Sequence, residues 1–235
     1  VIRNGSPLAC IYGISFPYKK VTDNLALGFK RDQVSGFAIG VLHTNVGGDP
    51  GYENYAPCKM EHLLGAGMDY WALGHIHARR ILRDREPAIV YCGNTQARSY
   101  KEEGEKGCYL VTLDDNRPPD IRFAPTDVIR FHSVDLDLSS CADLDSALKS
   151  IRARCEEVSR NAGERDVLIR LNLTGCTAVH SELQKTGSVH GLLEEVGGYF
   201  EGREPGIWID LTVETRGTYD LDMLRELLLQ GLPMS

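Results

Sequence analysis

The sequence predicts an α/β protein of two parts, and three patterns support this. Two short apolar runs, residues 37–42 and 70–74, each lead directly into a histidine, as buried parallel strands do where they open into a site. Residues 143–160 carry apolar side chains on one helical face, which is typical of an amphipathic helix. Strand patterns at residues 129–136 and 166–173 flank that helix. The fold class is therefore α/β, with a small α+β domain at the end.

The first part extends over residues 1–125 and is expected to begin with a strand at residues 8–14. A short helix capped by Thr22 or Asp23 follows. The long loop at residues 47–57 holds two prolines and two tyrosines, and long loops are commonly functional. The remaining expected elements are a strand at 37–42, a helix at 59–65, a strand ending at Gly74, paired strands at 79–82 and 88–91, a strand at 107–113 and a turn at 114–119.

The second part, residues 126–235, begins where the composition and the hydrophobic pattern change, near Pro125. Its elements alternate between strand and helix patterns. They are expected at residues 129–136 (strand), 143–160 (helix), 166–173 (strand), from 181 onward (helix with glycine breaks), 206–213 (strand) and 221–230 (helix).

Composition limits the class of protein. A chain of 235 residues with 42% hydrophobic and 25% charged residues can bury a sizeable core. No apolar stretch is long enough to cross a membrane, and no charged leader with an apolar core opens the chain. The seven cysteines are scattered and form no C-x-x-C pair, so a reducing cytoplasm is expected. The chain opens directly on a strand pattern without methionine, and we expect a fragment of a longer protein.

Charge is unevenly distributed along the chain. Residues 1–125 hold 15 Lys and Arg against 14 Asp and Glu, a balance of +1, whereas residues 126–235 hold 11 against 19, a balance of −8. Between His75 and Lys101 the local balance is +4. This basic segment would attract a phosphate-bearing substrate, whereas the acidic second part repels nucleic acid on average.

Three histidines lie where strands are expected to end. His43 follows the first apolar run, and His75 and His77 follow the second with one residue between them. If strand geometry persists through residue 77, both of the later side chains lie on one face. Neutral imidazole is the commonest ligand for transition metals, so these residues are candidate metal ligands; a pair of surface histidines is the competing interpretation.

Four segments carry a family resemblance: residues 45–50 (Asn-Val-Gly-Gly-Asp-Pro), 54–58 (Asn-Tyr-Ala-Pro-Cys), 69–77 (Asp-Tyr-Trp-Ala-Leu-Gly-His-Ile-His) and 107–111 (Gly-Cys-Tyr-Leu-Val). In these motifs the chain resembles the calcineurin-like metallophosphoesterases, and among them the bacterial DNA-repair exonuclease branch, the SbcD-like and YhaO-like proteins. The resemblance implies the distal half of a metallophosphoesterase β-sandwich flanked by helices, followed by a small capping domain. It is specific over residues 8–115.

The resemblance also implies a centre of two divalent metal ions, usually Mn²⁺. His43 and His75 would bind one ion and His77 the other. The family's upstream motifs, Asp-x-His, the bridging Gly-Asp and Gly-Asn-His-Asp/Glu, do not occur at the required positions, and the last of these supplies the proton-donor histidine. We therefore assign no catalytic residue and expect this chain alone to be inactive and to bind at most one ion, weakly.

Four further residues are candidates for substrate binding. Asn94 and Arg98 belong to a Gly-Asn-x-Gln-x-Arg segment after the next strand, and Arg79 and Arg80 follow the histidines. They would contact substrate phosphates. A turn-forming Asn and structural or solvated Arg residues are the alternative interpretation.

Three function classes remain open at this stage. The first is part of a metal-dependent DNA exonuclease or endonuclease in DNA repair. The second is a metallophosphoesterase acting on a small phosphate ester or cyclic nucleotide, because a metal motif does not select the leaving group. The third is a non-catalytic module that binds DNA or an ATPase partner. Expected partners are DNA, an SMC-like ATPase subunit and a second copy, and no membrane.

Overall fold

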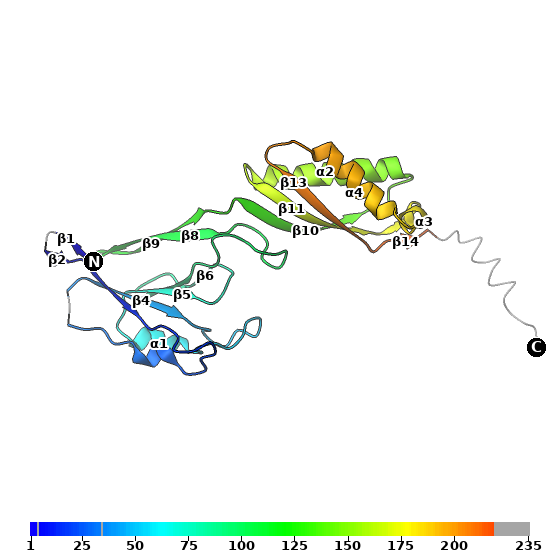
Figure 1. The fold of residues 1–235 in the computed structure, drawn as a ribbon. Helices are drawn as coiled ribbons and strands as arrows, with labels where there is room; N and C mark the ends of the chain where they lie inside the picture. The colour runs from blue at the N-terminus through cyan, green and yellow to red at the C-terminus, as the bar shows by residue number, and fades with distance from the viewer. Residues whose placement is uncertain (4, 34, 219–235) are drawn as a thin grey trace, which may run out of the picture. The chain divides into compact units, whose positions relative to one another are not determined.

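The computed structural model describes residues 1–3, 5–33 and 35–218, and these form two compact units (Figure 1). The first unit holds residues 1–97 and 105–127. The second holds residues 98–104 together with those from 128 onward. The short segment 98–104 therefore groups with the second unit, although the sequence assigned it to the first part. Helices combine with parallel and antiparallel strands, which confirms the α/β class.

The first unit is built on a five-stranded sheet of order β3-β4-β5-β7-β6. β3 to β5 and β7 are parallel, and β6 pairs antiparallel with β7, as predicted for residues 79–82 and 88–91. The strands are β3 (Ala9–Gly13), β4 (Phe37–His43), β5 (Tyr70–Gly74), β6 (Arg80–Arg83) and β7 (Ala88–Tyr91). A small antiparallel pair, β1 (Ile2–Arg3) and β2 (Ser6–Pro7), precedes them. The prediction of neighbouring parallel strands before the histidines is confirmed.

Short helices cover one face of this sheet, where the fully buried Trp71 packs against Phe29 at 4.8 Å between ring centroids. They are the 3₁₀ helix η1 (Leu25–Gly28) and α1 (Met60–Gly65). The predicted cap of the first helix is wrong. Asn24 accepts the hydrogen bond from the Ala26 N–H, so the helix begins one residue later than a cap at Asp23 would allow.

The hairpin of β8 (Gly107–Asp114) and β9 (Arg117–Pro125) covers the opposite face of the sheet. Its apolar side chains, among them Tyr109 and Val111, pack on Tyr70 and Val90. The sequence predicted a turn at residues 114–119, but only residues 115–116 turn and β9 then begins. Pro118 and Pro119 lie near the start of β9, where its pairing with β8 shifts register between Thr112 and Asp114, and strands tolerate residues without an N–H at edges and bulges.

The second unit is built on three parallel strands in the order β10-β11-β13. They are β10 (Ile129–Asp137), β11 (Asp166–Thr174) and β13 (Ile207–Val213), and a short parallel pair, β12 (Cys176–Thr177) with β14 (Arg216–Gly217), extends one end. Helices connect the parallel strands, so this unit is α/β in the strict sense and the predicted α+β assignment is wrong. The alternation of strand and helix patterns along this part is the signal of such βαβ units, and the α+β assignment did not use it.

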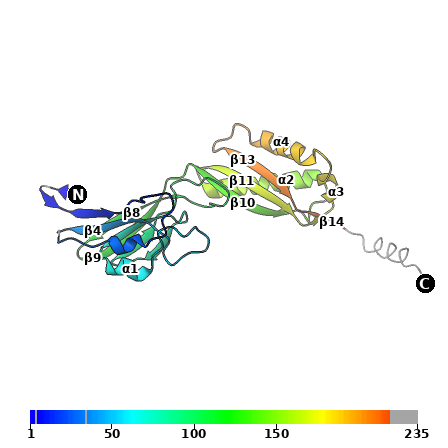
Figure 2. The same ribbon diagram turned by 60° about the horizontal axis from the view of Figure 1, so that its bottom comes forward.

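The helices of the second unit are α2 (Leu144–Ala162), α3 (His180–Leu183) and α4 (Ser188–Phe200). α2 and α4 cover the same face of the sheet, where Ile151 and Val196 are fully buried (Figure 2). The helix predicted at residues 143–160 is present as α2, and Asp143 is its N-cap, accepting from the Ser146 N–H at 2.8 Å. The predicted helix at 221–230 lies outside the described residues. No helix within the described ranges is long and apolar enough to cross a membrane.

Candidate functional site

Two imidazoles meet at the carboxyl ends of β4 and β5. His43 is the last residue of β4 and pairs with Gly74, the last residue of β5. His75 therefore follows directly after the end of the neighbouring strand. The two rings are 5.1 Å apart between centroids, at 69° to one another. A Cβ on residue 74 would lie 3.0 Å from Nδ1 of His43, which is tighter than ordinary van der Waals contact. Glycine at position 74 therefore leaves room for the His43 ring.

His75 has an unusual backbone conformation, with a φ of 101°. Such values are rare for residues with a side chain and persist where the surrounding structure imposes them. Nε2 of His75 lies 2.7 Å from the backbone carbonyl oxygen of Glu53. Because a carbonyl oxygen can only accept, Nε2 donates, and in the neutral ring Nδ1 keeps its lone pair. The Nδ1 atom is therefore the atom of His75 able to bind a cation or accept a proton.

His77 lies beyond the end of β5, which stops at Gly74. The premise that strand alternation places His75 and His77 on one face is therefore wrong, since the positive φ of His75 breaks the strand geometry. Instead, both rings contact Tyr52, at centroid distances of 5.8 and 6.3 Å. The His77 carbonyl accepts from the Asn94 N–H at 3.1 Å, which joins this segment to the loop after β7.

Aromatic side chains surround the histidines, and the sequence prediction did not include them. Phe16 lies 5.4 Å from His43 and Tyr55 lies 5.7 Å from His75, both edge to face. Tyr52 completes the set. The signal in the sequence was the length of the loop at 47–57, which supplies both tyrosines. Their rings hold the imidazoles in fixed orientations.

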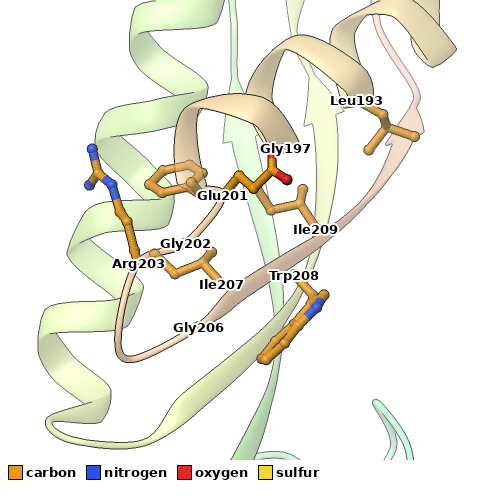
Figure 3. Close-up of a pocket in the computed structure, with 10 residues that line it drawn as sticks. Leu193, Gly197, Glu201, Gly202, Arg203, Gly206, Ile207, Trp208 and Ile209 are labelled. Atoms are coloured by element: carbon orange, nitrogen blue, oxygen red, sulfur yellow. The ribbon is translucent and has the colours of Figure 1, made fainter.

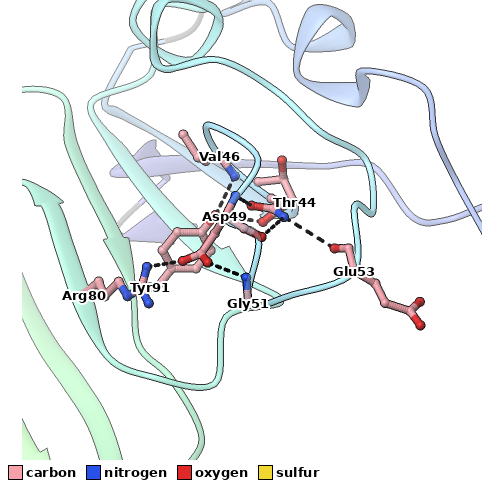
Figure 4. A network of polar contacts seen from close by, with 8 residues as sticks. Thr44, Val46, Asp49, Gly51, Glu53, Arg80 and Tyr91 are labelled. Atoms are coloured by element: carbon pink, nitrogen blue, oxygen red, sulfur yellow. Dashed lines mark hydrogen bonds and ion pairs between the residues drawn. The ribbon is translucent and has the colours of Figure 1, made fainter.

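Buried polar groups hold this loop in place (Figure 4). Asn45, 1% exposed, accepts from the Asp49 N–H at 2.8 Å through Oδ1, and its Nδ2 donates to the carbonyls of Asp49 and Glu53 at 3.2 and 3.5 Å. The Tyr91 hydroxyl donates to the Thr44 carbonyl at 2.7 Å. These bonds place the Glu53 carbonyl where it meets His75.

The electrostatic environment favours a neutral His43. Burial, and then the neighbouring His75 and His77 rings, lower the pKa of His43 from its ordinary value. Asp49 belongs to the loop at residues 47–57, and its side chain is an acid rather than a base. The Gly51 N–H, followed by the Arg80 guanidinium, lowers the pKa of the Asp49 carboxyl. The loop thus contributes a carboxylate, but Arg80 already neutralises it.

The predicted phosphate-binding arginines all have acidic partners. Arg79 pairs with Glu105 at 3.4 Å and its guanidinium stacks 3.7 Å from the centroid of Phe123. Arg80 pairs with Asp49. Arg98 belongs to the second unit, where its guanidinium lies 3.9 Å from Glu102.

Asn94 follows Gly93 in the first unit. Its Nδ2 atom is buried, and no hydrogen-bond partner for it exists within the described part of the chain. The roles of Asn94 and of the three arginines in binding phosphate stay predictions.

The three histidines do not complete a metal centre by themselves. Across residues 1–3, 5–33 and 35–218, no group of three or more His, Cys, Asp or Glu side chains could hold a metal ion. Two divalent cations also need anionic ligands, and the nearby Asp49 is paired with Arg80. The residues present therefore do not fit a two-metal centre without further ligands, and we assign no catalytic step to this chain.

The comparisons with known proteins identify the class to which the chain is related. Residues 131–216 match the family model described as metallophosphoesterase YhaO, middle domain. Together with the relatives described next, this match confirms the predicted resemblance to the calcineurin-like metallophosphoesterases of the DNA-repair branch.

Two particular relatives show what the chain is similar to. The uncharacterized metallophosphoesterase YhaO of Bacillus subtilis is 30% identical over 223 residues, which cover 94% of this chain and 54% of that protein. The DNA double-strand break repair protein Mre11 of Methanocaldococcus jannaschii is 36% identical over 74 residues, 28% of this chain and 20% of that protein. The chain thus spans about half the length of its YhaO relative.

Proposed function

We propose that this chain is part of a metal-dependent phosphoesterase that hydrolyses phosphodiester bonds in DNA. The observation that supports it best is the meeting of His43 and His75 at the carboxyl edge of two neighbouring parallel strands. Sites of α/β proteins form at this edge. One relative is named as a metallophosphoesterase, and the other is named for DNA double-strand break repair.

The histidines would supply the imidazole part of the ligand set. We assign His43 and His75 to one ion and His77 to the other, with Mn²⁺ as the expected metal. Bound divalent ions acidify water and stabilise negative charge on attacking and leaving oxygens. The carboxylate ligands would come from residues beyond this chain, which spans about half of its YhaO relative.

Residues near the histidines would bind the substrate. Asn94 offers a buried amide nitrogen without a partner in the described residues, in the segment bonded to the His77 carbonyl. Arg79 and Arg80 would bind phosphates by exchanging Glu105 and Asp49 for them. We also propose that Arg98 contacts a substrate phosphate. The expected partners are an SMC-like ATPase subunit and a second copy of the chain, and the expected location is the cytoplasm.

The test is cleavage of duplex DNA in Mn²⁺ by the chain extended to the length of its YhaO relative. We expect His43→Ala and His77→Ala each to abolish most turnover while DNA binding survives. His190→Ala is the matched control, because among the described residues that exposed histidine forms an ion pair with Glu194 alone, four residues along the same helix. Efficient hydrolysis of a simple phosphate diester with intact DNA would overturn the nuclease assignment and favour a small-molecule phosphoesterase.

A further inference from the structure

Strand β13 is an edge strand among the described residues of the second unit. The carbonyl of Gly206 accepts from Val167, and the N–H of Glu214 donates to Leu173, so even-numbered backbone groups point toward β11. Because backbone groups alternate along a strand, the N–H and C=O groups of the odd-numbered residues 207–213 point to the free edge. The strand contains no proline or lysine, the residues that usually protect an edge.

A groove of about 410 Å³ runs beside this edge, between α4 and β13 (Figure 3). Its apolar lining on the α4 side of the strand comes from Leu193, Gly197, Phe200, Ile207 and Ile209. A Cβ on Gly197 would meet nothing within 4 Å, so the helix leaves open space here. The groove can therefore receive a side chain from a strand placed along the edge.

Trp208 offers an apolar surface on the other side of the strand. Trp208 is 53% exposed, which is unusual for tryptophan. The indole lies across Gly206, where a Cβ would be 2.5 Å from the ring. An added strand would thus find an apolar groove on one face and an aromatic ring on the other.

The charges around the edge are mainly negative. Glu164, Glu201 and Glu204 are exposed and line this groove or the adjoining one. Their carboxylates have no hydrogen bond or ion pair with another described residue. Two cations lie nearby: Arg203 pairs with Glu156 at 3.1 Å, and Arg160 lines a further pocket beside Glu204. A basic partner is therefore favoured, whereas DNA and a second copy of this acidic rim are repelled.

We propose that the free edge of β13 binds an extended peptide by strand addition. Backbone hydrogen bonds to residues 207, 209 and 211 would provide the pairing. Alternate apolar residues of the peptide would enter the groove, and the basic residues between them would lie over Trp208 near the glutamates. This surface is separate from the histidine site and does not depend on the proposed function.

The test uses the full chain and a capped ten-residue synthetic peptide of alternating valine and lysine, with binding followed by amide chemical shifts. We expect shifts at residues 207–211. The same peptide with alternate backbone nitrogens methylated keeps its charge but cannot pair as a strand, and it should bind roughly tenfold more weakly or worse.

Two matched variants on α4 localise the binding. Gly197→Val fills the groove and should weaken binding roughly tenfold or more. Gly191 does not line the groove, so Gly191→Val should leave binding unchanged. The two variants are matched because a Cβ at either position meets nothing within 4 Å. The proposal is overturned if the methylated peptide binds equally well, if Gly197→Val has no effect, or if no peptide binds. Self-association of the chain through the same edge, or displacement of the peptide by duplex DNA, would also overturn it.

Discussion

The backbone carbonyl of Glu53 accepts a hydrogen bond from Nε2 of His75 at 2.7 Å. This bond joins residues 22 positions apart and connects a surface loop to the end of a buried strand. It fixes the protonated nitrogen of the neutral ring and leaves Nδ1 available. Partners of this kind orient metal-binding histidines in many proteins, and their loss weakens metal affinity. The loop that supplies Glu53 is therefore part of the site.

Asn45→Ala should destabilise the protein and disturb His75. The buried Asn45 amide makes three hydrogen bonds within the loop, and its removal leaves buried backbone groups without partners. We expect the free energy of unfolding to fall by about 2 kcal/mol. Denaturant unfolding measures it, and the His75 ring ¹⁵N shifts should change as well. Asn161→Ala, at an exposed position, is the control. Unchanged His75 shifts would show that the loop does not orient this ring.

Gly74→Ala should displace the His43 ring. The added methyl would lie 3.0 Å from Nδ1 of His43, so the imidazole or the strand must move. We expect weaker binding of Mn²⁺ in the extended protein. Gly65→Ala is the matched control, since a Cβ there meets nothing within 4 Å, and it should stabilise α1 slightly. Equal Mn²⁺ affinity for the two variants would exclude a role for the His43 position in metal binding.

Asp49→Asn should make stability less sensitive to acid. The Gly51 N–H and then Arg80 depress the pKa of Asp49 in the folded state. Because the pKa of Asp49 is lower in the folded than in the unfolded state, its ionised form stabilises the fold. This stability is fully present above the ordinary pKa of 3.8 and is lost as the pH falls through the lower pKa of the folded state. Unfolding followed from neutral pH to below 3.8 should show a smaller loss for Asp49→Asn than for the wild type. Parallel curves would contradict this contribution.

The sequence predicted the strands that carry the histidines because hydrophobic runs and the glycine and histidine residues after them are local signals. His43 and His75 could be brought together from the sequence alone, since parallel neighbours end at one edge. The positive φ of His75 could not be predicted, because it depends on a loop folded by Asn45 and Tyr91. The parallel order of the second unit was also missed, although the alternation of strand and helix patterns along that part is the signal of βαβ units.

Ion pairs between residues far apart in the sequence are another feature that the sequence alone could not predict. Arg79 and Arg80 appeared as free cations beside the histidines, but their partners Glu105 and Asp49 lie 26 and 31 residues away in sequence. A local count of charges cannot find such pairs. Strand β9 was missed for a related reason. Two prolines suggested a turn, although strands tolerate them at edges and bulges.

Manganese binding measured by calorimetry tests the central claim most directly, namely that His43, His75 and His77 belong to a metal centre completed from outside this chain. We expect at most one weakly bound ion for residues 1–235 alone and two ions for the chain extended to the length of its YhaO relative. His77→Ala in the extended protein should lose one ion, whereas the exposed His190→Ala should keep both. Two tight sites in this chain alone, or unchanged occupancy in His77→Ala, would contradict the account.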